Sequence, residues 1–466
     1  MAEDALHKTP SQADNENQPL LSPPEDQDNE AGSEFPVKSS IYSMKSSEKK
    51  ESPASAGVTT LLKYVIALGI LAIPYVSARV GLFPALILIL FVGYLNLYAL
   101  KLLDAVATDL NLKKVDLGRM CYLVSRKTGF QYFAEINLHI MCMGGVIIEV
   151  VFIAEYLGEV SCILDWTIFC DRKLMQLVLI FALIMPVMTI TDLHYLAIPN
   201  MIALMVQLGF IIILLVTSIN LIQSNGVASG GLEAALTKFE FSGLPVAFTT
   251  ILFAYEGVGV FMEVRGSVGD KLNKVLNWGF AFAALGYMVV TSTAVLAYGD
   301  ATNSIIFLNL DQHNEFYLVF ELGYLISIIL GIPTQLFAIT RIIENYKIFR
   351  SFIQVENTNK KSKLKRQLIR IPLLLIIVSI AMVIPSFSSF LNIISGITFT
   401  ITAFAIPVIL YYIHFQDDPT KRFKRFMNWV LLAIAIVAGV IATVQSIMEM
   451  VNGSSTTTTA TTAAAA

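Results

Sequence analysis

The sequence predicts an all-α polytopic membrane protein, and three observations point to that fold class. Hydrophobic residues make up 55% of the 466 residues, charged residues only 14%, and the mean hydropathy is +0.68. A water-soluble domain of this size cannot bury so large an apolar fraction. The apolar residues also form runs long enough to cross a hydrocarbon core roughly 30 Å thick as helices. Finally, the basic residues lie between these runs and mostly on one side of the predicted membrane.

Residues 1–52 differ from the rest of the chain because they contain no apolar run. They are rich in Ser, Pro, Asp, Glu, Asn and Gln and cannot bury enough surface to fold, so we predict a disordered cytosolic tail. Within it, the stretch ENQPLL fits an acidic dileucine sorting signal formed by Glu16, Leu20 and Leu21, which cytosolic adaptors read. This signal slightly favours a vacuolar or lysosomal membrane over the plasma membrane.

Residues 53–450 form the predicted transmembrane domain, with about eleven helical spans. The apolar segments cover residues 57–79, 81–103, 133–158, 174–191, 195–222, 244–264, 275–298, 317–347, 369–386, 389–414 and 427–450. With the N-terminus in the cytosol, all but five of the 32 Lys and Arg residues fall on the cytosolic side. An odd number of spans then places the low-complexity tail 451–466 in the lumen or outside the cell. Asn452 begins an N-glycosylation sequon there, which predicts a glycoprotein.

The four cysteines do not form a disulfide scaffold. Cys162 and Cys170 share one short non-cytosolic loop, where an oxidising compartment allows a local disulfide. Cys121 and Cys142 are expected to be free thiols. Because no Cys/His cluster has metal-ligand spacing, we expect neither a metal site nor a cofactor.

The first apolar segment contains LLKYVIALGILAIPY, in which Gly69 and Pro74 lie near the middle and Lys63 lies nearer the start. Pro74 removes a backbone donor, and Gly69 lets the backbone approach another group. Backbone groups freed at mid-membrane are tolerated where they line a cavity or are buried in protein, as in the discontinuous helices of transporters. On this motif alone, a discontinuous helix and a simple proline kink are equally acceptable interpretations.

The sixth segment, FTTILFAYEGVGVFMEV, carries a similar mark. Gly257 and Gly259 lie in its middle, and the carboxyl group of Glu256 lies beside them. A charged group at this depth is costly and therefore suggests a function. Glu256 could take up and release a proton or bind a solute amine. Alternatively, it is a neutral side chain that caps backbone groups freed by a broken helix.

Other spans also contain polar residues. Glu149, Glu155 and His139 lie in the third segment, where one of them could face an aqueous path or simply satisfy a neighbouring helix. Thr334 and Gln335 lie in the eighth segment and could line the path, although such residues also hold helices together.

Taken together, these motifs resemble the amino acid/auxin permease family, especially its proton-assisted amino acid transporters and vacuolar neutral amino acid transporters. The matching stretches are LLK to GILAIP at Leu61–Pro74, FAYEGVGV at Phe253–Val260, AYGDATNSIIFLNL at Ala297–Leu310 and PTQLFAITRIIEN at Pro333–Asn345. The resemblance covers residues 57–450.

The resemblance implies a leucine-transporter-like five-plus-five inverted repeat with discontinuous helices 1 and 6 and an additional eleventh helix. It also implies that the solute binds between those two helices. The residues that this places at the substrate site are Ala67, Leu68, Gly69, Ile70, Phe253, Tyr255, Gly257 and Gly259.

The sequence departs from the family pattern at three places. Ala67 replaces the first glycine of the usual Gly-x-Gly in the first span, which predicts a narrower backbone approach or a smaller substrate. Glu263 and Arg265 replace a proline and an acidic residue after the sixth-span core. Lys63 stands where sodium-coupled relatives tend to have Asn, and its ammonium group could fill the space of a bound sodium ion. We expect structural roles for Lys63 and Pro74, and proton coupling or facilitated export in place of sodium coupling.

These inferences predict a secondary active transporter, a proton-coupled symporter that moves neutral amino acids by alternating access. Its broken helices would present amide donors to the substrate carboxylate and carbonyl groups to its ammonium group, while Glu256 changes protonation. The alternative is an amino acid sensor that signals through the N-terminal tail. Because no nucleophile and base pair or nucleotide loop is recognisable, we do not expect an enzyme. The expected partners are an amino acid, protons, the lipid bilayer and a sorting adaptor, with no nucleic acid.

Overall fold

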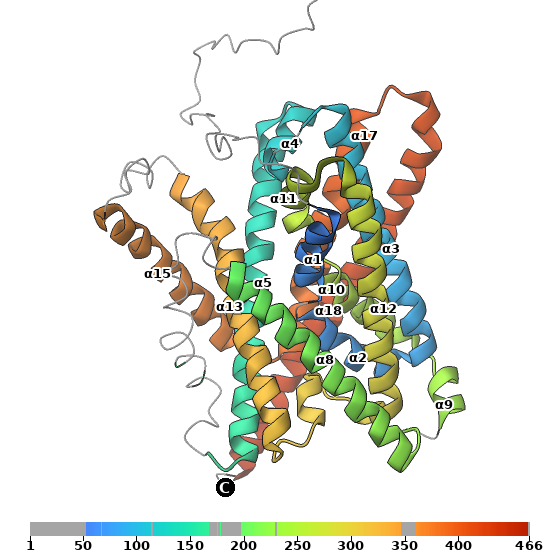
Figure 1. The fold of residues 1–466 in the computed structure, drawn as a ribbon, viewed down its shortest axis with the longest axis vertical. Helices are drawn as coiled ribbons and strands as arrows, with labels where there is room; N and C mark the ends of the chain where they lie inside the picture. Colours follow the sequence, from blue (N-terminus) through green and yellow to red (C-terminus); the bar gives the residue numbers. More distant parts are fainter. Residues whose placement is uncertain are drawn as a thin grey trace, which may run out of the picture. The chain divides into compact units, whose positions relative to one another are not determined.

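The structure, a computed structural model, describes residues 53–66, 68–112, 115–166, 197–228, 231–345 and 360–464, together with residues 175 and 178. All secondary structure within these ranges is helical, which confirms the predicted all-α fold (Figure 1). Ala67, Cys170 and the tail 1–52 with its sorting motif lie outside the described residues, as does the side chain of Thr334.

The described helices follow one another along the chain with short connections. The first part contains α1 (Ala54–Val65), α2 (Gly69–Val80), α3 (Leu82–Asp109), α4 (Leu117–Ser125), α5 (Thr128–Ile163) and α8 (Ala197–Asn225). The middle part contains α9 (Leu232–Thr237), α10 (Leu244–Ala254), α11 (Val258–Val268), α12 (Leu272–Tyr298) and α13 (Glu315–Asn345). The last part contains α15 (Lys360–Val383), α16 (Phe387–Ile394), α17 (Ile406–His414) and α18 (Arg422–Ala464).

Eight helical stretches in the described part of the chain are long and apolar enough to cross a membrane. They are Leu82–Asp109, Thr128–Ile163, Met201–Asn225, Phe241–Met262, Val264–Ala301, Glu315–Ile332, Phe387–His414 and Pro419–Asn452. Each coincides with one predicted segment. Of the other three predictions, the first segment is divided between α1 and α2, and the ninth overlaps the shorter apolar helix Arg370–Val383. The fourth, 174–191, lies almost wholly outside the described residues, so the total of eleven stays a prediction.

Local sequence explains where several helices begin and end. Asp116 caps α4 because its carboxylate accepts a hydrogen bond from the amide of Arg119 at 2.7 Å. Gly81 separates α2 from α3 with a φ of 109°, a conformation open to glycine but rarely to other residues. A Cβ at this position would lie 1.9 Å from the carbonyl oxygen of Lys238. Glycine is therefore required both by the turn and by the close approach of the 238 backbone.

The interrupted helices are packed inside the bundle. The short helix α1 packs on α12, and α10 packs on both α2 and α3, as Figure 1 allows the reader to follow. Nearly every residue of α2 is buried. By contrast, α8 and α18 expose large apolar side chains such as Ile212 and Val437. An exposed apolar surface of this extent is suited to lipid rather than water, which makes the protein a multi-pass membrane protein.

Candidate functional site

The first predicted span is broken between Val65 and Gly69. The α1 helix ends at Val65, α2 begins at Gly69, and Ile66 and Leu68 lie between them. Pro74 lies well inside α2, which continues past it to Val80. The interruption therefore precedes the proline, and the discontinuous helix, rather than the simple proline kink, is confirmed.

The sixth predicted span is broken in the same way. The α10 helix ends at Ala254 and α11 begins at Val258, so that Tyr255, Glu256 and Gly257 form the connection. In a continuous helix the carbonyl of Ala254 would accept from the amide of Val258, four residues on. The break frees both groups, which is the discontinuity that the sequence predicted.

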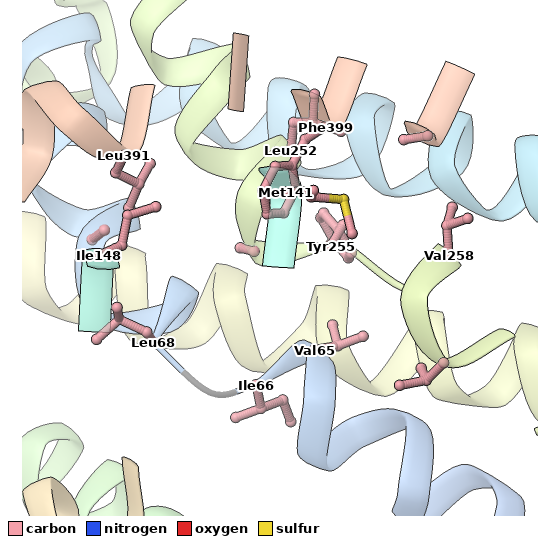
Figure 2. Close-up of a cluster of buried hydrophobic side chains, with 14 of the residues drawn as sticks. Val65, Ile66, Leu68, Met141, Ile148, Leu252, Tyr255, Val258, Leu391 and Phe399 are labelled. Carbon is pink, nitrogen blue, oxygen red and sulfur yellow. The ribbon is translucent and has the colours of Figure 1, made fainter. Parts of the chain in front are cut away.

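The two breaks meet at Gly69. A Cβ added to this residue would lie 2.4 Å from the Cα of Ala254, closer than side-chain atoms approach in real structures. The first residue of α2 and the last residue of α10 are therefore in direct backbone contact. Figure 2 shows side chains from both connections, including Leu68 and Tyr255, in the same apolar cluster. Gly69 thus allows the close approach of backbones that the sequence predicted.

Tyr287 of α12 joins the two breaks. Its hydroxyl donates to the carbonyl oxygen of Ala254 at 2.8 Å and also contacts the carbonyl oxygen of Val65. These carbonyls belong to the last residues of α10 and α1, whose helical acceptor sites the breaks leave open. Tyr287 has no exposed surface. The sequence analysis missed this residue, and the only available signal was a polar aromatic residue in the middle of an apolar span.

Glu256 caps the second half of the sixth span. Its Oε1 accepts a hydrogen bond from the amide of Gly259 at 2.8 Å, in the first turn of α11. A carboxylate at a helix N-terminus satisfies an amide that the break leaves open and complements the helix dipole. This contact matches the capping role that the sequence left open for Glu256. It is equally compatible with a carboxyl group that exchanges this bond for a proton.

Aromatic residues enclose the connection in the sixth span. The ring of Tyr255 stacks on Phe280 at 5.7 Å between centroids and meets Tyr287 edge-on at 5.0 Å. Tyr255 is fully buried, and its hydroxyl has no hydrogen-bond partner among the described residues. Phe253 is partly buried and packs on Phe399 at 5.4 Å. Together with buried Leu68 and Ile70, these rings give the predicted site an apolar lining.

The tenth predicted span also departs from a regular α-helix beside this site. Two π-helical turns, Ser395–Phe399 and Ile401–Ala405, separate α16 from α17. Asn137 of α5 donates to the carbonyl oxygen of Thr398 at 3.0 Å and to Oγ1 of Thr402 at 2.6 Å. π-helical turns recur at functional sites, and Phe399 brings one of them against the break in the sixth span (Figure 2).

Asn392 of α16 fixes that helix to α10. Its Oδ1 accepts hydrogen bonds from the hydroxyls of Thr249 and Thr250, both at 2.8 Å. All three side chains are buried. The sequence analysis missed this cluster, because short polar residues in apolar spans give no indication of their distant partners.

The acidic residues of the third span bind neighbouring helices. Glu149 is 6% exposed and accepts a hydrogen bond from Nε2 of Gln335 on α13 at 2.6 Å. Glu155 accepts a hydrogen bond from the amide of Phe387 at the start of α16, at 3.0 Å. His139 bonds the carbonyl oxygen of Glu135 on its own helix. Each of these side chains therefore has a structural partner away from the two breaks.

The remaining predicted residues lie in different parts of the fold. Lys63 lies in α1 and is partly buried, and Pro74 is buried in α2. Cys162 is disulfide-bonded, whereas Cys121 and Cys142 are free thiols as expected. Because Cys170 is outside the described residues, its pairing stays a prediction. Asn452 is exposed on α18, as a glycan acceptor requires.

A polar cavity of about 470 Å³ lies at the other end of α2. Its lining includes Arg79, Ser386, Ser389, Glu449 and Asn452. Arg79 Nη1 and Glu449 Oε1 are 3.9 Å apart, and both side chains are more than half exposed. Water screens such a pair, so it contributes little to stability. In the predicted orientation, this cavity opens on the non-cytosolic side.

Arg265, near the end of α11, is bonded to α3. Its Nε donates to Oδ1 of Asp104 at 2.8 Å and its Nη2 to the hydroxyl of Thr108 at 3.1 Å. Another guanidinium nitrogen donates to the carbonyl oxygen of Leu112. The Arg265 and Asp104 side chains are only 14% and 18% exposed, so water screens this ion pair weakly. In the predicted orientation, the contact ties the cytosolic end of the sixth span to the second.

Replacing Arg265 with methionine is expected to lower stability by about 2 kcal/mol, because Asp104 is left with an uncompensated and largely buried charge. The measurement is the midpoint of thermal unfolding in detergent. Arg422→Met is the matched control, since Arg422 is exposed at the start of α18. Equal midpoints for the two variants would show that the Asp104 contact does not hold α11.

Comparisons with known proteins were made for the whole chain. A family profile described as "Transmembrane amino acid transporter protein" matches residues 50–451. The chain is 24% identical to Vacuolar amino acid transporter 4 of Saccharomyces cerevisiae, over 85% of this chain and 59% of the yeast protein. It therefore spans less than two thirds of that relative.

Other relatives are matched over different extents. Amino acid transporter AVT3B of Arabidopsis thaliana is 24% identical over 86% of this chain and 95% of the plant protein. The Proton-coupled amino acid transporter-like protein pathetic of Drosophila melanogaster is 25% identical over 42% of this chain and 41% of that protein.

Proposed function

Since the chain belongs to the transmembrane amino acid transporter family, we propose that it is a secondary active transporter of neutral amino acids. It works by alternating access and is coupled to protons. The observation that carries this proposal is the contact between two interrupted helices at Gly69 and Ala254. It gathers unpaired backbone groups of both signs at one place inside the membrane-spanning bundle.

These backbone groups suit the two charges of an amino acid. Within the described residues, no side chain caps the N-terminus of α2. The amides of Gly69 and Ile70 therefore attract a carboxylate, as helix N-termini do. The carbonyl groups at the ends of α1 and α10 carry partial negative charge and attract an ammonium group. Leu68, Phe253 and the Tyr255 to Gly259 connection lie next to both ends, and we assign them to the substrate site with Ala67.

The apolar surroundings support a neutral substrate. The side chains labelled around the breaks in Figure 2 are aliphatic or aromatic or belong to Met141. A charged substrate side chain would lose its hydration there without gaining a partner, which is costly. Gln335 and Thr334 provide polar groups farther along α13, and we assign them to the path rather than to the site.

Proton coupling is assigned to Glu256. It is the carboxyl group within the connection of the sixth span, and it is bonded to the first turn of α11. Protonation would weaken this bond and free the α11 amides, so a proton can change how the two halves of the span are held. The fruit-fly relative that is named as proton-coupled supports this choice.

The cellular address is proposed to be a vacuolar or lysosomal membrane. Relatives from yeast are named vacuolar amino acid transporters. In our orientation the N-terminus lies in the cytosol, and the cavity beside Arg79 and Asn452 opens into the lumen as the path to the site. A disulfide between Cys162 and Cys170 and a glycan at Asn452 would lie on the same luminal side.

The deciding experiment is uptake of labelled amino acids into proteoliposomes that contain the purified protein. A proton gradient, a sodium gradient or no gradient is imposed. We expect neutral amino acids to accumulate with the proton gradient, and charged ones to be excluded. Stimulation by sodium alone would contradict proton coupling. Saturable binding without uptake would instead support an amino acid sensor that acts through residues 1–52.

A further inference from the structure

We propose that the hydroxyl group of Tyr287 competes with the substrate ammonium group for the carbonyls of Val65 and Ala254. Binding of an amino acid then requires Tyr287 to give up these two acceptors. Tyr287 thereby sets the affinity of the site and recognises only substrates with a free amine. This inference rests on the proposed transport of amino acids and adds a residue that controls it.

The geometry places one donor between two acceptors. The Tyr287 hydroxyl is 2.8 Å from the carbonyl oxygen of Ala254 and also bonds that of Val65. These two residues are far apart in sequence, and each is the last residue of its helix before a break. A phenol has a single hydrogen to donate, so the two carbonyls share it in a three-centre bond. Neither carbonyl is therefore fully satisfied.

An ammonium group is a better partner for the same pair. It has three hydrogens, so it can donate separately to both carbonyls. Its positive charge also strengthens each bond and complements the C-terminal ends of α1 and α10. The exchange is therefore favourable, but the binding free energy is reduced by the bond that Tyr287 loses.

Removing the hydroxyl has an unusual expected sign. In Tyr287→Phe, the carbonyls have no internal partner, so the ammonium group binds without competition. The loss of one net hydrogen bond predicts an apparent KM roughly three- to tenfold lower than that of the wild type. The return of the empty transporter should be slower, because the carbonyls are left without a donor in the buried site. Net uptake should therefore have a lower maximal rate, whereas exchange of internal for external amino acid is retained.

A purely structural role predicts the opposite sign. If Tyr287 only holds the two breaks together, its loss loosens the site and raises KM for every ligand. A carboxylic acid with the same side chain but no amine separates the two possibilities, because it cannot take the carbonyls from Tyr287. Its inhibition constant should be equal in wild type and Tyr287→Phe.

The experiment measures uptake, exchange and inhibition in proteoliposomes for wild type, Tyr287→Phe and Thr291→Val. Thr291 lies one turn further along α12, is 1% exposed, and its hydroxyl has no hydrogen-bond partner among the described residues. Its removal should leave KM unchanged. A higher or unchanged KM in Tyr287→Phe would overturn the proposal, and so would an equal shift in the inhibition constant of the des-amino acid.

An infrared measurement on the wild-type protein keeps the test decisive if the Tyr287→Phe protein does not fold. Protein with isotopically labelled tyrosine should show a shift in a tyrosine C–O band when the amino acid is added. The des-amino acid should not produce this shift. No shift, or the same shift with both ligands, would overturn the proposal. If the wild type transports no amino acid at all, the proposed function itself fails, which is a separate outcome.

Discussion

Replacing Gly69 with alanine is expected to abolish amino acid uptake. The added methyl group would lie 2.4 Å from both the Cα and the Cβ of Ala254, and a backbone atom cannot move aside as a flexible side chain can. The first residue of α2 and the last residue of α10 would have to separate. This would move the amides and carbonyls that we assign to the substrate apart. Forcing atoms into a packed core typically costs about 1–3 kcal/mol.

Uptake in proteoliposomes and the midpoint of thermal unfolding are measured together for this variant. Gly209→Ala is the control, because a methyl group on Gly209 of α8 would meet no atom within 4 Å. The sequence alone suggested that a larger residue at Gly69 would block the substrate without disturbing the protein. The structure changes this expectation, since the clash is with the neighbouring helix. Wild-type uptake by Gly69→Ala would show that the two breaks do not meet there.

Replacing Glu256 with glutamine is expected to remove the effect of a proton gradient on accumulation. The glutamine carbonyl oxygen can still accept from the amide of Gly259, so the cap on α11 is kept while the titratable group is lost. Uptake with a proton gradient should fall to the level measured without one. Exchange of amino acids across the membrane should continue, because it does not require net proton movement.

Glu256→Ala separates the two roles of this residue. It removes the proton site and also the cap, whose loss typically costs about 1 kcal/mol. We therefore expect it to lower the unfolding midpoint, whereas Glu256→Gln should not. If Glu256→Gln keeps the full response to the proton gradient, Glu256 is only a helix cap and the proton acts elsewhere.

The breaks in the first and sixth spans could be predicted because their cause is local. Gly69 and Pro74 in one span, and Glu256 between an aromatic residue and glycine in the other, are unfavourable in a continuous apolar helix. Such a conflict is visible in the letters themselves. Its exact position was less visible, because Pro74 drew attention to a point inside α2 rather than to the connection before Gly69.

The roles of the buried polar residues could not be decided in this way. Glu149 and Glu155 were equally suited to an aqueous path and to a helix contact, and their contacts to Gln335 and Phe387 show the second. Tyr287 was not selected at all. It contacts Val65 across 222 residues of sequence, and a single tyrosine in an apolar span does not reveal such a partner.

The sequence by itself determined that the chain crosses a membrane as helices, and that the first and sixth spans are interrupted. These properties follow from hydropathy and from the conformational limits of single residues, which act over one or two helical turns. Only the tertiary structure decided that the interruptions meet at Gly69 and Ala254, and that Tyr287 holds the carbonyl groups that both breaks leave open. Such contacts depend on how distant helices pack, since a freed backbone group can be satisfied by any donor that the fold brings within about 3 Å.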